Sequence, residues 1–149
     1  MTQLYMAALQ KVTGAAAGPI ATLLAPAGAR PDIREIGIFV ASAPATGPTI
    51  GFGRPAAVGA GGASGGLLGQ ATEPADPAAT CTLAPAFVTT QPTAPAIPMT
   101  RITLPPSIGA GMVWTFNPQE LAVAQSGNLV LWQFSALAVT YEVYMKWEE

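Results

Sequence analysis

The stretch "LAVTYEVYMKWEE", residues 137–149, decides the fold class. From Val139 onward, apolar and mostly polar side chains alternate. The apolar set is Val139, Tyr141, Val143, Met145 and Trp147, and the other set is Thr140, Glu142, Tyr144, Lys146 and Glu148. A period of two residues is typical of a half-buried strand. We therefore predict a central strand over 138–147 that seals its apolar face in the core and turns its polar face toward a subunit interface.

Short apolar or alternating runs, separated by turn residues, fill most of the remaining sequence. They predict strands near 4–12, 19–25, 33–42, 49–54, 80–90, 99–104, 111–116, 120–124 and 128–134. The first of these runs also fits one face of a helix, although its length and its neighbours favour a strand. This spacing predicts one all-β domain over residues 1–149, either an antiparallel sandwich or a barrel.

Two segments differ from this pattern in their composition. Residues 59–69, "GAGGASGGLLG", hold six glycines, which predicts a mobile loop without a fixed surface. Residues 73–98 hold six prolines, which cannot donate hydrogen bonds to a strand ladder. We expect this stretch to be an extended arm or an edge segment, and either contact with neighbouring subunits or a long surface loop fits it.

Charge is scarce in this chain. Only 9% of the residues are charged, against about 25% in typical globular domains, while 50% are hydrophobic. No uninterrupted apolar run approaches the roughly 20 residues of a membrane span, so we expect no membrane partner. The six basic residues are scattered and the net charge is -2, so we expect no direct contact with nucleic acid. A subunit whose surface is covered by protein partners explains this composition best.

Few residues offer catalytic chemistry. The chain has no histidine, which removes the usual nucleophile–base pairs and imidazole metal sites, and Cys81 is its single cysteine. Pairs of carboxylates, Asp32 with Glu35 or Glu35 with Glu120, are conceivable in a glycosidase. A structural ion pair or an interface hydrogen bond is the better interpretation of Glu35. We expect no enzymatic activity, no cofactor and no bound metal.

The aromatic residues permit one alternative function. A sugar-stacking platform, as in carbohydrate-binding β-sandwiches, could use Trp114, Phe116, Trp132, Phe134, Tyr141 and Trp147. Each of these residues lies in a predicted strand, where an aromatic side chain more often packs in a core or an interface. Packing is therefore the favoured interpretation.

Five motifs in order resemble a family of small virion structural proteins from tailed bacteriophages and actinobacterial prophages. They are "IREIGIF", "GFGRPAAVG", "LPPSIGAGMVWTF", "ELAVAQSGNLVLWQ" and "YEVYMKWEE", within about 19–54 and 101–149. The resemblance implies a jelly-roll-like sandwich that decorates or completes a capsid, with a tail or tail-tip subunit as an alternative. It implies no catalytic residue.

The resemblance also implies partners and a location. We expect a homo-oligomer, preferably a trimer because cementing proteins often sit at three-fold positions, in contact with a major capsid protein or other virion proteins. Our interface candidates are Arg34, Glu35, Trp132, Tyr144 and Trp147. The sequence opens without the basic and apolar regions of a signal peptide, so we expect synthesis in the host cytoplasm and assembly into the virion.

Overall fold

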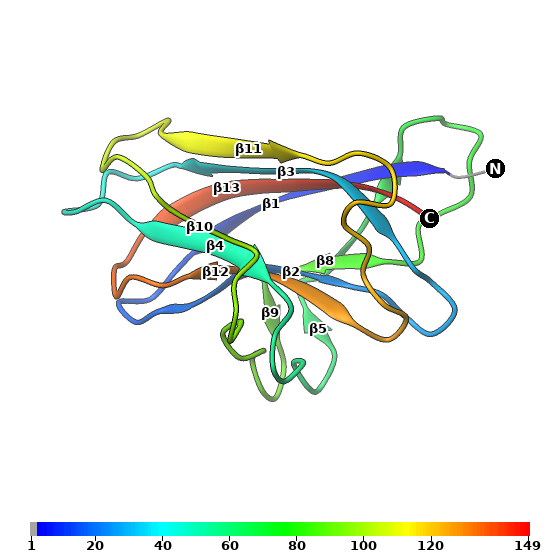
Figure 1. Cartoon of the computed structure of the whole chain (residues 1–149), viewed down its shortest axis with the longest axis horizontal. Coiled ribbons are helices and arrows are strands. Elements are labelled where there is room, and N and C mark those ends of the chain that lie inside the picture. Colours follow the sequence, from blue (N-terminus) through cyan, green and yellow to red (C-terminus); the bar gives the residue numbers. More distant parts are fainter. Residues whose placement is uncertain (1–2) are drawn as a thin grey trace.

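Two antiparallel sheets stack face to face in the computed structural model, which describes residues 3–149 (Figure 1). The first sheet has the order β11 (Gly111–Thr115), β3 (Asp32–Val40), β13 (Thr140–Glu148), β1 (Leu4–Val12) and β7 (Gln70–Ala71). The second has the order β10 (Thr100–Thr103), β4 (Thr49–Gly53), β12 (Asn128–Gln133), β2 (Gly18–Leu24), β8 (Thr82–Ala84) and β6 (Leu67–Leu68). The predicted all-β sandwich is confirmed, and a jelly-roll-like arrangement is compatible with it.

The strand predicted at the end of the sequence is β13, and it occupies the centre of the first sheet. It pairs along its whole length with β1, from Thr140 opposite Val12 to Glu148 opposite Leu4, and β3 flanks its other side. All five members of the apolar set are buried, with Trp147 and Met145 fully enclosed. The prediction that this strand is central and sealed on one face is confirmed.

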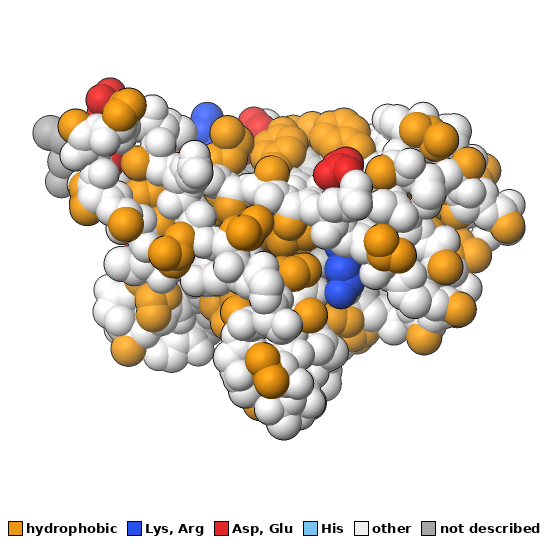
Figure 2. Space-filling model, turned by 180° about the vertical axis from the view of Figure 1, so that it is seen from behind, with side chains coloured by type: hydrophobic (Ala, Val, Ile, Leu, Met, Phe, Trp, Pro, Cys, Tyr) orange, Lys and Arg blue, Asp and Glu red, His pale blue; other side chains and the backbone are white. Residues whose placement is uncertain are grey.

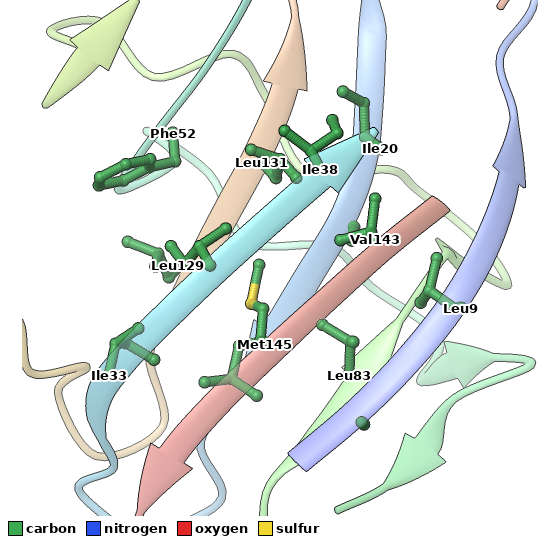
Figure 3. Packing of buried hydrophobic residues seen from close by; sticks show 14 of the residues in the cluster. Leu9, Ile20, Ile33, Ile38, Phe52, Leu83, Leu129, Leu131, Val143 and Met145 are labelled. Atoms are coloured by element: carbon green, nitrogen blue, oxygen red, sulfur yellow. The ribbon is translucent and has the colours of Figure 1, made fainter. Parts of the chain in front are cut away.

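The core fills the space between the two sheets with mainly aliphatic side chains, joined by a few aromatic ones such as Trp147. Figure 3 shows Ile33 and Ile38 of β3 and Val143 and Met145 of β13 facing residues of the second sheet such as Leu129. No helix in residues 3–149 is long and apolar enough to cross a membrane.

A buried polar network lies at one end of this core. The Gln133 side chain donates to the carbonyl oxygens of Ser135 and Leu137, at 2.8 and 2.5 Å, and accepts from Thr13 and Tyr141, at 3.1 and 2.8 Å. Each donor and acceptor of the amide is therefore paired, as a buried polar group requires.

A bulge in β3 controls which side chains reach the outer face of the first sheet. Trp147 lies opposite Ile33, but Lys146 lies opposite Glu35, so Arg34 is the extra residue. An extra residue shifts the alternation by one position. As a result, Arg34 and Glu35 are both half-buried on the outside, while Ile33 and Ile36 both remain in the core.

Two strand predictions were wrong. Residues 120–124 form no strand and make one isolated bridge, between Ala122 and Asp32, because left-handed backbone at Gln119 (φ 64) and Ser126 (φ 56) bends the chain on both sides. The predicted strand over 80–90 is divided into β8 and β9 (Ala86–Phe87), with Pro85 between them. Proline has no N–H to continue the ladder of β8.

The glycine-rich and proline-rich segments pack against each other and form a protrusion that we call the lobe, residues 55–66 and 85–98. Its strands β5 (Ala63–Ser64) and β9 pair, and the N–H of Ala60 donates to the carbonyl of Thr90 at 2.9 Å. In Figure 1 the lobe hangs below the second sheet. Part of the glycine-rich segment 59–69 is therefore paired with the proline-rich segment, and its predicted mobility stays a prediction.

The proline-rich segment also contacts the two sheets of its own domain. Pro95 packs beside Gly53, and the N–H of Met99 donates to the carbonyl of Phe52 at 2.8 Å. Nearer its start, the carbonyl of Pro77 accepts a hydrogen bond from the Tyr5 hydroxyl at 3.1 Å. These contacts place the segment on the surface of the same chain at both ends.

Candidate interaction surfaces

Three of the interface candidates meet on the outer face of the first sheet, and we call this group the polar face: Arg34, Glu35 and Tyr144. The Tyr144 hydroxyl donates to Glu35 Oε1 at 2.5 Å, and its ring lies over Gly37, where a side chain would collide with it. Arg34 donates to Glu148 Oε1 at 3.0 Å. Two features bring these side chains together: the bulge in β3, and the alternation along β13, where even-numbered side chains point outward.

The charged and hydroxyl groups of the polar face interact with one another and with Asp32. The hydrogen bond to Glu35, together with burial and the Glu35 charge, raises the pKa of Tyr144 to about 12. Arg34 also lies 3.8 Å from Asp32, which accepts from the N–H of Gln119 at 2.5 Å. One buried oxygen of Asp32 and one buried nitrogen of Arg34 have no hydrogen-bond partner within residues 3–149.

The carboxylates considered for glycosidase chemistry are held in separate contacts. Glu35 binds Tyr144, Asp32 binds Gln119 and Arg34, and Glu120 accepts from the backbone N–H of Asn117 at 2.7 Å. Within residues 3–149, no group of three or more Cys, Asp or Glu residues could hold a metal ion. What this arrangement can do is fix the geometry of a surface.

Trp147 lies on the opposite side of β13 from the polar face, so its assignment as an interface residue was wrong. Its exposed fraction is 0%. The indole N–H donates to Glu149 Oε1 at 2.8 Å, and the ring lies 6.4 Å from the ring of Tyr5. A side chain at an odd position of β13 faces the core and offers nothing to a partner.

Glu149 is a structural residue that the sequence analysis missed. Its carboxylate accepts from Trp147 and also from the backbone N–H groups of Thr80 and Cys81, at 2.8 and 2.9 Å. Burial raises the pKa of Glu149, but these hydrogen bonds outweigh burial and leave that pKa below its ordinary value. The need of a buried indole N–H for an acceptor was the signal that pointed to a nearby carboxylate.

Trp132 is half-buried on the second sheet, cross-strand from Gly51, and faces away from the core. The neighbouring ring of Phe134 is covered by the Arg101 guanidinium, 4.6 Å from the ring centre. Trp114 packs edge-on against Phe52 at 5.3 Å. With Tyr141 and Trp147 buried, the six aromatic residues do not form the single sugar platform that we considered.

The lobe presents an uncharged surface. The sequence has no charged residue between Arg54 and Glu73 or between Asp76 and Arg101. Exposed apolar side chains on the lobe are Val58 at 52%, Val88 at 68% and Ile97 at 86%. Figure 2, seen from behind, shows the lobe at the bottom with hydrophobic side chains and no acidic or basic ones. The two uncharged runs were the signal that could have revealed this surface.

A shallow apolar hollow of about 440 Å³ lies at the edge formed by β1, β6 and β7, lined by residues that include Met6, Leu67 and Leu68.

Comparison with known proteins adds no relative: no family model, no curated protein and no solved structure matches this chain. The surfaces of the molecule are therefore the observations on which a function can be argued.

Proposed function

We propose that this chain is a non-enzymatic structural protein of a tailed-bacteriophage virion, a capsid decoration or minor capsid protein that stabilises the particle as a homo-oligomer. The observation that carries the proposal is the uncharged lobe with its exposed apolar side chains. An uncharged protrusion that exposes several apolar side chains is suited to contact with other proteins, which is the role we infer for it.

The architecture supports a contact role over a chemical one. The Gln133 amide is fully paired within the fold, and on the polar face Glu35 and Glu148 accept structural hydrogen bonds from Tyr144 and Arg34. A rigid sandwich with an uncharged protrusion suits a subunit that fills a gap between neighbours. The net charge of -2 also suits a position outside the DNA compartment.

Electron microscopy of particles that lack the gene tests the proposal directly. We expect heads that assemble but break more readily on heating or dilution, and that regain stability when purified protein is added. Heads without tails would instead assign the chain to the tail.

A second experiment uses the lobe. Ile97→Lys places one charge at the most exposed apolar position of the lobe, and Glu73→Lys is a control that changes charge outside it. We expect the first variant to bind deficient particles at least about tenfold more weakly, the equivalent of about 1.4 kcal/mol, and the control to bind normally. Equal binding by both variants would contradict a docking role for the lobe. Retention of a glycan on an array would favour the carbohydrate-binding alternative.

A further inference from the structure

We propose that β11 pairs with β11 of a second copy of this chain, so that two first sheets join into one continuous antiparallel sheet across a two-fold axis. The inference gives a specific contact to the homo-oligomer, and it rests on the self-association in the proposed function. It starts from the backbone of an edge strand.

β11 has a free backbone edge because β3 is its one partner strand in the first sheet. At its two ends, the N–H of Val40 donates to the carbonyl of Ala110 at 2.8 Å, and the N–H of Phe116 donates to that of Arg34 at 2.9 Å. Hydrogen bonds in an antiparallel ladder alternate along the strand. The N–H and C=O groups of Gly111, Val113 and Thr115 therefore point away from β3.

Natural edge strands are usually protected by charge, proline, a bulge or short length. β10, the edge of the second sheet on this side, carries Arg101 and lies between Pro98 and Pro105. The edge strands on the far side, β6 and β7, have two residues each. β11 has five residues in unbroken register with β3, without charge or proline. It is the unprotected edge among the strands of residues 3–149.

The strand is complementary to itself. An antiparallel pair centred on Val113 sets Val113 opposite its own copy, Met112 opposite Trp114 and Gly111 opposite Thr115. The first is a β-branched pair and the second a sulfur–aromatic contact, and both are favourable between strands. The third pair contains a glycine and adds no steric conflict. The outward N–H and C=O groups of both strands find partners in this register.

Charge also favours a second copy over another occupant. No charged residue lies between Arg101 and Glu120, so two copies approach through this edge without like charges meeting. Val113 is 41% exposed and Met112 is 37% exposed, so the edge is accessible in the single chain. A basic or acidic peptide would find no complementary charge on β11.

The two-fold contact has a consequence for the number of copies. It produces assemblies with an even number of chains. The simplest is a dimer. If a separate three-fold contact forms trimers, the β11 contact joins two of them into a hexamer. The expected trimer therefore becomes part of a larger assembly or is replaced by a dimer.

The test measures the mass of the full chain at micromolar concentration by light scattering. We expect an even-numbered assembly for the wild type and for Val113→Thr, which keeps a β-branched residue. Val113→Lys should halve the number of chains, because two ammonium groups would face each other, and Ile97→Lys on the lobe should leave it unchanged. Val113→Pro should act like Val113→Lys, since it removes an outward N–H that β3 does not use.

A cross-link fixes the register. Paired residues that exchange hydrogen bonds have Cα atoms about 5.5 Å apart, within disulfide range. Val113→Cys should give a covalent dimer on oxidation, and Ile97→Cys should not. The buried Cys81 should form no disulfide in either variant.

Three results would overturn the inference. They are an odd-numbered wild-type assembly, an assembly that survives Val113→Lys and Val113→Pro, and a monomer that loses particle binding on Val113→Lys, which would assign β11 to a strand of another virion protein. The proposed function fails separately, when particles lacking the gene are unaffected.

Discussion

Trp147 carries the largest stabilising contribution that we assign to a single residue. It is fully buried, its ring packs against Tyr5 and against Gly69, and its N–H is paired with Glu149. Trp147→Ala should reduce the free energy of unfolding by about 3 to 5 kcal/mol, the range for deleting a buried aromatic side chain. Urea denaturation measures this loss.

Trp132→Ala is the matched control, since Trp132 is half-buried on the outside of the second sheet. We expect a clearly smaller loss there. Equal losses for the two variants would contradict the assignment of Trp147 to the core.

Glu149 should make stability depend on acidity. Its pKa is depressed in the folded state, because hydrogen bonds from Thr80, Trp147 and Cys81 outweigh burial. A depressed carboxyl pKa stabilises the fold at pH values above the unfolded pKa, about 4.5, and this stabilisation is lost as pH falls through the lower folded value. We expect Glu149→Gln to be less stable than wild type at pH 7, and the difference to shrink below pH 4.5.

Urea midpoints measured from pH 7 down to acid unfolding check this dependence. Glu73→Gln, at an exposed position, is the control and should follow the wild type. A stability difference between Glu149→Gln and wild type that stays constant over this range would show that the carboxylate charge is irrelevant.

At the scale of elements, the sequence predicted the strands whose apolar and polar residues alternate with a period of two. β13 and β1 alternate between buried and exposed residues, and this alternation was visible in the residues themselves. The bulge at Arg34 was not visible, because it depends on register with a partner strand. Likewise, Leu121 and Val123 alternate as a strand would, but left-handed backbone at Gln119 and Ser126 limits them to one bridge.

The candidate surfaces follow the same division. Arg34, Glu35 and Tyr144 were predicted because polar side chains in an apolar strand must leave the core. Trp147 is an odd-numbered residue of β13 and Tyr144 an even-numbered one, so the two side chains point to opposite faces of the sheet. This alternation already argued against naming both as interface residues. The lobe escaped prediction because β5 and β9 have two residues each, too short for any period, and the bridged residues Ala60 and Thr90 are far apart in sequence.

The lobe should contribute to stability, contrary to what glycine content alone indicates. Deleting residues 61–66, "GGASGG", removes β5 and part of the backbone bonding to residues 86–90. Phe87, 5% exposed, would lose cover. We expect a loss of about 1.5 to 3 kcal/mol, the value of exposing one large apolar side chain.

Thermal and urea unfolding measure the effect of this deletion. The matched control deletes Ala15 and Ala16 from the exposed connection between β1 and β2, where little change is expected. A lobe deletion as mild as the control would support the prediction of a mobile loop over residues 59–69.

At the scale of the whole molecule, the shortage of charge and the arrangement of surfaces are connected. Acidic and basic side chains are concentrated where they serve the fold, as in the Arg34–Glu148 ion pair and the Glu149 carboxylate. The lobe and the β11 edge have none. Surfaces of this kind avoid both the desolvation cost of burying ions and repulsion between copies.

Self-association through the β11 edge should couple folding to protein concentration. Because unfolding then separates chains, the thermal midpoint rises with total concentration. For a dimer, a hundredfold increase contributes about 2.7 kcal/mol shared by two chains, or a rise of about 3 to 5 °C at about 2 to 4 °C per kcal/mol. Calorimetry between about 1 and about 100 μM spans this range.

The rise should be nearly the same at low and high salt, since uncharged contacts are not screened. A midpoint independent of concentration would contradict self-association, and a rise that disappears in salt would assign it to charged residues such as those of the polar face.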